Sequence, residues 1–212
     1  MPTNTNLYST PNYVKLLIFI ILFLNNIKSS LQSKNMRAII IPGNNNTSIL
    51  ESWYPYVKKE LEKLGLDVIA KNMPDPDLAR KQFWLPFIEE HVKNESNSIL
   101  VGHSSGAVAI LRYLEENKAG GTVLVGASHT DLNDKKEKIS GYFDEPWNWE
   151  KIRKNVKWII QFASTDDPYI PIAEARHING KLNSEYYEFT NHGHFMQAEF
   201  PELVEAIRKK LA

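Results

Sequence analysis

Short apolar runs rich in β-branched residues recur along the chain, and stretches with helical spacing of apolar side chains lie between them. Runs of four to six such residues, bounded by turn residues, are typical of strands buried on both faces of a sheet. Strands that alternate with helices form a mostly parallel sheet with helices on both faces. The chain is therefore expected to have an α/β fold, with strands at 37–41, 67–70, 98–102, 122–125, 158–162 and 185–189, helices at 53–64, 77–91, about 105–117, 172–178 and 201–211, and a polar, aromatic-containing stretch at 126–157.

Composition excludes several classes of function. The 212 residues contain 25 Lys and Arg, 25 Asp and Glu, and no Cys. A nucleic-acid binder would carry a basic stripe, so no nucleic-acid partner is expected. The absence of Cys excludes disulfide frameworks, a cysteine nucleophile, iron–sulfur clusters and thiolate zinc sites. We expect neither a metal nor a cofactor, and the chain is expected to be a monomer.

The first 35 residues differ from the rest, because they contain three lysines and no acidic residue. They include nine consecutive apolar residues at 16–24, which is too short to span a bilayer but fits the apolar region of a signal peptide. Three interpretations are open: translation starts at Met36, the segment is a signal or anchor, or it belongs to the domain. The first predicts a cytoplasmic and also nuclear protein, the second a secretory or membrane-associated one. We take 1–35 as an N-terminal extension and 36–212 as the domain.

The most informative motif is Gly102-His103-Ser104-Ser105-Gly106, which lies between a predicted strand and a predicted helix. G-x-S-x-G in this context is typical of a tight turn that presents its central serine above the end of a sheet. Side chains two positions before and after the serine would collide in such a turn, which explains the two glycines. Ser104 is therefore the candidate nucleophile.

A serine hydroxyl needs a base beside it, and the base needs a carboxylate that orients it. In this fold the three residues follow the order serine, acid, histidine. His91 and His177 lie in predicted helices, His103 lies inside the turn, and His129 precedes the candidate acids. The loop after the last strand supplies His192 and His194, and Gly193 favours His194 as the base because it permits an unusual backbone angle there.

The acid is expected in the loop after the strand at 158–162, where Asp166 and Asp167 both qualify by position. Asp167 precedes Pro168 and gives the pattern D-x-x-I-P, which resembles the acid loop of many α/β-hydrolases. We choose Asp167 and expect Asp166 to cap the turn. Asp144 and Glu145 precede this strand and are poorer candidates.

Two backbone amides are expected to stabilise the negative oxygen that forms when a serine attacks a carbonyl carbon. The amide of Ser105, at the start of the helix, is one candidate. The other should come from the loop after the first strand, where Gly43 allows close approach and Asn44 follows. We expect Asn44 and Ser105 to form the oxyanion hole.

With these residues placed, the chain resembles the retinoblastoma-binding protein 9 family of small serine hydrolases. The matching stretches span nearly all of 36–212 and lie at 39–44, 57–61, 70–76, 84–87, 102–106, 140–143, 146–151, 161–168 and 193–195. The resemblance implies a compact α/β-hydrolase fold without a large lid, and a triad on Ser104, Asp167 and His194. Residues 1–35 lie outside the match, which favours a start at Met36.

The resemblance also implies small ester or amide substrates, including aminoacyl compounds with bulky aromatic groups. Phe143, Trp147 and Trp149 are the residues expected to wall such a pocket. The L-x-C-x-E motif that gives the family its name is absent, because the corresponding segment at 90–95 reads EHVKNE. Binding to the retinoblastoma protein is therefore not expected.

Two alternatives to a small esterase or amidase stay open at this point. One is a non-catalytic protein-interaction module built on a hydrolase fold. The other is a thioesterase or lipase-like esterase, which needs a long apolar slot for an acyl chain. The chain offers only the stretch at 126–157 for a lid, so the second alternative ranks lower.

Overall fold

The computed structural model describes residues 13–21, 36–92 and 97–211. Six strands form one fully parallel sheet in the order β2-β1-β3-β4-β5-β6. Alternating strand and helix segments thus produce the expected α/β fold. The strands are β1 (Arg37–Ile41), β2 (Asp67–Ala70), β3 (Ser98–His103), β4 (Gly121–Val125), β5 (Ile159–Ser164) and β6 (Glu185–Phe189).

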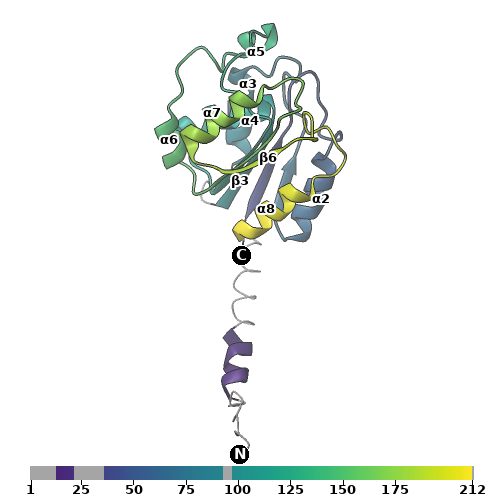
Figure 1. Ribbon diagram of the computed structural model, residues 1–212, viewed down its shortest axis with the longest axis vertical. Coiled ribbons are helices and arrows are strands. Elements are labelled where there is room, and N and C mark those ends of the chain that lie inside the picture. The colour runs from purple at the N-terminus through teal and green to yellow at the C-terminus, as the bar shows by residue number, and fades with distance from the viewer. Residues whose placement is uncertain (1–12, 22–35, 93–96, 212) are drawn as a thin grey trace, which may run out of the picture.

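Helices cover both faces of this sheet (Figure 1). On one face α2 packs beside α8, and on the other α3 and α6 pack against α4 while α7 packs against α6. Their bounds are α2 (Tyr54–Lys63), α3 (Lys81–His91), α4 (Ser105–Glu116), α5 (Lys135–Ser140), α6 (Trp149–Lys154), α7 (Ile172–Leu182) and α8 (Pro201–Leu211).

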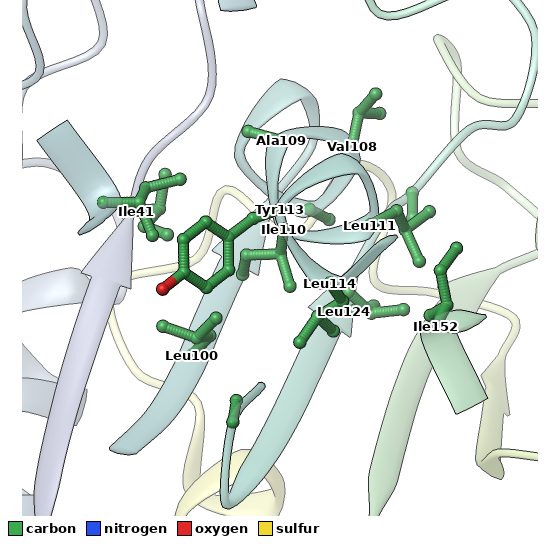
Figure 2. Close-up of a cluster of buried hydrophobic side chains, with 14 of the residues drawn as sticks. Ile41, Leu100, Val108, Ala109, Ile110, Leu111, Tyr113, Leu114, Leu124 and Ile152 are labelled. Carbon is green, nitrogen blue, oxygen red and sulfur yellow. The ribbon is translucent and has the colours of Figure 1, made fainter. Parts of the chain in front are cut away.

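Two apolar cores follow from the alternation of side chains along the strands. Ile39 and Ile41 of β1 join one core, whereas Ala38 and Ile40 join the other. Figure 2 shows Leu100 and Leu124 from the central strands facing the side chains of α4. Burial on both faces explains why the inner strands β1, β3, β4 and β5 are largely apolar, whereas the edge strands β2 and β6 are only partly buried.

The second predicted helix begins later than expected. Asp77 does not cap it; α3 begins at Lys81, with Arg80 as the preceding residue. Ala79 has a φ of 51°, which a helix cannot continue through, and the Asp75 carboxylate accepts a hydrogen bond from the Arg80 amide at 3.1 Å. The segment around Asp77 is therefore a loop, and Pro86 lies inside the helix as expected.

The stretch between β4 and β5 contains two six-residue helices, α5 and α6, that the apolar pattern does not reveal. Each is marked by its cap. The Asp134 side chain accepts from the amides of Lys136 and Glu137, and Asn148 accepts from the amide of Lys151. No lid domain arises from this stretch.

Residues 13–21 form a helix in which the apolar side chains of Leu16, Leu17 and Phe19 are more than half exposed. The rest of the first 35 residues lies outside the described part, as do residues 93–95 of the segment compared with L-x-C-x-E. Across the described ranges, 13–21, 36–92 and 97–211, no helix has the length and apolar character needed to cross a membrane.

The strand register sets the position of the candidate site. Ile41 is paired with Gly102, and His103 with Val125, so the carboxyl ends of β1, β3 and β4 lie side by side. Ser164 of β5 is paired with Phe189 of β6. The loops that carry Asn44, Ser104, Asp167 and His194 therefore all leave the same edge of the sheet.

Candidate active site

Ser104 occupies a strained turn between β3 and α4. Its φ is 54° and its ψ is −124°, a conformation that non-glycine residues rarely adopt and that costs about 1–3 kcal/mol. The Ser104 amide donates to the carbonyl oxygen of Val125 at 2.8 Å, and its own carbonyl accepts from the amide of Ala107 at 2.9 Å. The ends of β4 and α4 together hold the serine in this conformation.

The glycines on either side of the turn have no room for a side chain. A Cβ on Gly102 would lie 2.6 Å from the amide nitrogen of Ala107, and one on Gly106 would lie 2.4 Å from the carbonyl oxygen of Ile41. Both neighbours are backbone atoms, which cannot move aside cheaply. A side chain at either position would therefore collide with the backbone, as the motif predicts.

Replacing Gly106 with alanine should destabilise the protein by about 3 kcal/mol, because the new methyl group overlaps the end of β1. Gly180 provides the matched control. It lies exposed in α7, where a Cβ would meet nothing within 4 Å, so Gly180→Ala should stabilise the fold by about 1 kcal/mol. Urea unfolding of both variants checks the prediction, and equal stabilities would contradict it.

The candidate base and acid contact each other. His194 Nδ1 lies 2.8 Å from Asp167 Oδ2, and only 10% and 2% of the two side chains are exposed. The other carboxylate oxygen of Asp167 accepts from the amides of Tyr169 and Ile170 at 2.9 and 3.0 Å. The carboxylate is therefore fixed, and it fixes the imidazole so that Nε2 is the ring nitrogen left to exchange a proton.

The end of β4 connects this pair to Ser104. The Ser104 amide donates to Val125, and the next residue, Gly126, lies directly under the imidazole. A Cβ on Gly126 would be 3.3 Å from His194 Cε1, so a side chain there would push against the base. An imidazole oriented by a carboxylate near a strained serine is the arrangement that nucleophilic attack on a carbonyl requires.

The alternative residues make other contacts. Asp166 accepts from the Ser164 hydroxyl at 2.5 Å and from the amide of Gly193 at 2.9 Å. It therefore joins the loop after β5, which carries Asp167, to the loop after β6, which carries His194. His192 Nδ1 lies 3.0 Å from Asn191 Oδ1, and its ring lies 4.0 Å from that of Phe189. Gly193 has a φ of 50°, the unusual backbone angle expected before His194.

His103, inside the serine turn, holds the backbone of the loop that carries His194. Its Nε2 donates to the carbonyl oxygen of His194 across 2.8 Å, and its Nδ1 lies 2.6 Å from the Tyr54 hydroxyl. Burial lowers the pKa of His103 to about 3, and the nearby His194 adds to this. A neutral ring with its proton on Nε2 satisfies both contacts, with the Tyr54 hydroxyl as donor.

Both residues expected to supply oxyanion donors lie next to Ser104 or to a residue that approaches it closely. Ser105 is the first residue of α4, where an amide has no acceptor within its own helix. Asn44 follows Gly43, and a Cβ on Gly43 would lie 3.3 Å from the Cβ of Ser104. The side chains of Asn44 and Ser105 both donate to Glu137, at 2.9 and 2.8 Å.

Phe143, Trp147 and Trp149 form one aromatic cluster. The Trp147 ring is stacked 5.4 Å from Trp149 and meets Phe143 edge-on at 6.2 Å. All three are half-buried against the core on the α4 side of the sheet. The Trp147 Nε1 donates to the carbonyl oxygen of His129 at 2.8 Å, so the cluster is attached to the loop that starts at Gly126.

Sequence reasoning missed the contacts that Tyr54 and Glu137 make with His103, Asn44 and Ser105. Tyr54 has only the signature of a core residue on α2. Glu137 stands three residues after Asp134, a spacing that marks a helix start but not the direction of the carboxylate. Within the described part of the chain, no group of three or more His, Cys, Asp or Glu is arranged to hold a metal.

Comparisons with known proteins identify the family of this chain. The family model described as serine hydrolase matches residues 38–211. The chain is 44% identical over 177 residues to the serine hydrolase RBBP9 of Rattus norvegicus, a match that covers 82% of this chain and 95% of that protein. It is 33% identical over 156 residues to the hydrolase YdeN of Bacillus subtilis (strain 168), covering 69% and 80% of the two chains.

The crystal structure of the ydeN gene product from B. subtilis superposes with a TM-score of 0.76 and 26% identity, covering 82% of this chain and 98% of that one. The structure of Est1E from Butyrivibrio proteoclasticus with bound ferulic acid shares the fold, with a TM-score of 0.67 at 13% identity over 84% and 89% of the chains. These likenesses establish an α/β-hydrolase fold. The chain belongs to the serine hydrolase family that includes RBBP9, and it is a hydrolase.

Proposed function

We propose that this hydrolase cleaves small esters or amides through a triad of Ser104, His194 and Asp167. The observation that supports the triad most strongly is the 2.8 Å contact between His194 Nδ1 and Asp167 Oδ2, beside a serine held at a φ of 54°. His129 also has a carboxylate partner, Glu174, 2.6 Å from its Nδ1, but its ring is stacked on that of His177, whereas the atoms nearest a Cβ on Gly126 belong to His194 and Asp167.

In the proposed reaction, Ser104 Oγ attacks the substrate carbonyl carbon while His194 Nε2 takes the hydroxyl proton. The amides of Asn44 and Ser105 stabilise the resulting oxyanion, a contribution worth about 10²–10³ in rate for each donor. The imidazolium then protonates the leaving alcohol or amine, which leaves an acyl group on Ser104. Water, deprotonated by His194, releases the acid and restores the serine.

The aromatic cluster supports a preference for substrates with a bulky aromatic acyl group. Trp147 and Trp149 are only partly buried, so each has ring surface outside the core. Trp147 is already fixed by the His129 carbonyl and by Arg112, whose guanidinium carbon lies 3.7 Å from the ring centroid. A fixed wall loses little conformational freedom when a ligand packs on it. Trp149 is the residue we expect to contact the substrate.

The function is tested with two chromogenic esters, p-nitrophenyl acetate and p-nitrophenyl 3-phenylpropionate. The wild type should hydrolyse both and prefer the aromatic ester. Trp149→Ala should lower kcat/KM for the aromatic ester by about tenfold, the usual effect of losing part of an apolar pocket, and leave the acetate ester within about twofold. The acetate ester is the internal control for folding.

Two results would count against the proposal. A folded wild type that hydrolyses neither ester would contradict the assignment of small esters as substrates. Equal losses on both esters in Trp149→Ala would contradict only the aromatic pocket, because the defect would then lie in the catalytic machinery.

A further inference from the structure

Glu137 of α5 is an ionisable residue that the proposed reaction does not use, yet it contacts both residues of the proposed oxyanion hole. Its Oε1 accepts hydrogen bonds from Asn44 Nδ2 at 2.9 Å and from Ser105 Oγ at 2.8 Å. Its Oε2 is buried and has no hydrogen-bond partner among the residues that the structure describes. One carboxylate oxygen thus joins the loop after β1 to the first turn of α4.

The helix that carries Glu137 is itself fastened to the same loop. The ammonium group of Lys136, the preceding residue, donates to Asn45 Oδ1 at 2.7 Å and to Asp77 Oδ1 at 2.6 Å. The Asp134 carboxylate caps α5 by accepting from the Lys136 and Glu137 amides at 2.8 and 3.1 Å. Lys136 and Glu137 of α5 therefore hold Asn45 and Asn44, two successive residues of the loop after β1.

The environment of Glu137 disfavours a charge. Burial raises the pKa of its carboxyl group, and the carboxylates of Asp134 and Asp131 raise it further, against the lowering effect of the bonds from Ser105 and Asn44. A raised pKa means that the ionised form is less stable in the folded chain than in the unfolded chain. Burying the Glu137 carboxylate therefore does not stabilise the fold at neutral pH. Its hydrogen bonds to Asn44 and Ser105 point instead to a role in the active site.

We propose that Glu137 is a positioning residue for the oxyanion hole, and that its two hydrogen bonds fix the Asn44 and Ser105 amides relative to each other. This inference rests on the proposed function. The two amides belong to separate segments, and a displacement of about 1 Å in such a site can cost about 10² in rate. Glu137 touches neither the nucleophile nor the base, so it acts only through the residues it holds.

The first test is steady-state hydrolysis of p-nitrophenyl acetate by Glu137→Ala and Glu137→Gln. Alanine removes both hydrogen bonds and should lower kcat by about 10–100-fold with KM changed by less than about threefold, because the oxyanion forms only in the transition state. Glutamine keeps an acceptor oxygen of the same reach and should stay within about fivefold of the wild type. Lys138→Ala, an exposed change on the same helix, is the matched control.

A mutant cycle isolates the hydrogen bonds. Asn44→Ala combined with Ser105→Ala deletes both donors and keeps both backbone amides, so this double variant should reproduce the loss seen in Glu137→Ala. Adding Glu137→Ala to it should lower kcat by no more than about threefold further, because interacting groups are strongly non-additive. Additive losses would overturn the proposal.

A readout independent of turnover separates this inference from the proposed function. Amide hydrogen exchange in residues 43–47 and 104–107 should be faster in Glu137→Ala than in the wild type or Lys138→Ala. If the wild type hydrolyses no ester but exchange is still faster in Glu137→Ala, the proposed function is contradicted and the positioning role is upheld. An active wild type with unchanged kcat in Glu137→Ala would overturn the positioning role alone, as would equal losses in the alanine and glutamine variants.

Discussion

Ser104→Ala should lower kcat for p-nitrophenyl acetate by about 10⁴–10⁶-fold, the range seen when a serine hydrolase loses its nucleophile. Alanine has no hydroxyl to form the acyl-enzyme, and only the oxyanion amides and binding contacts would still assist water. Alanine also fits the turn, since it adds no atom to a position with a φ of 54°. The measurement is kcat together with covalent labelling by a fluorophosphonate probe, and both should be lost.

Ser105→Ala is the control for this experiment. It removes the adjacent hydroxyl, which donates to Glu137 at 2.8 Å, but keeps Ser104 and the backbone amide. The variant should still be labelled stoichiometrically and should lose no more than about tenfold in kcat. Full labelling of Ser104→Ala, or loss of labelling in Ser105→Ala alone, would show that the nucleophile has been misassigned.

Asp167→Asn should lower kcat by about 10³–10⁴-fold, because it reverses the hydrogen bond that orients the base. One oxygen of Asp167 accepts from the Tyr169 and Ile170 amides. The asparagine oxygen will keep those bonds, which turns its NH₂ group toward His194 Nδ1. The imidazole must then carry its proton on Nε2 and can no longer accept one from Ser104.

The matched control is Asp166→Asn, which makes the same chemical change one residue earlier. Asp166 accepts from the Ser164 hydroxyl and the Gly193 amide through a single oxygen, and an asparagine oxygen can keep both bonds. Its kcat should fall by less than about tenfold. Comparable losses in the two variants would contradict the assignment of Asp167 as the orienting acid.

The sequence is most informative where one physical requirement governs many residues. The strands β1, β3, β4 and β5 are buried along nearly their whole length and mostly apolar, and all six strands lie within a few residues of their predicted bounds, including the less buried edge strands β2 and β6. The serine turn is equally predictable, because no residue with a side chain fits at Gly102 or Gly106. The order of serine, acid and histidine then directed attention to two loops, and the structure brings Asp167 and His194 into contact there.

Features that depend on individual side-chain contacts were not predictable in this way. The helices α5 and α6 are short and polar, so their signals are the caps at Asp134 and Asn148 rather than any periodic pattern. The late start of α3 depends on one hydrogen bond from the Arg80 amide to the Asp75 carboxylate and on the backbone of Ala79. The contact between Glu137 and Asn44 joins residues far apart in the chain, and neither residue carries a local mark of it.

The order of the strands has a consequence for when activity can arise during protein synthesis. The proposed nucleophile follows β3 in the middle of the sheet, whereas the proposed base follows β6, the last strand to leave the ribosome. A nascent chain that already contains β1 to β4 holds the serine turn and both proposed oxyanion residues, but not His194. Because β6 is added at the edge beside β5, a growing chain can bury much of its core before it can cleave a substrate. Hydrolytic activity is therefore expected only late in synthesis, after β6 and the loop that carries His194 have been added.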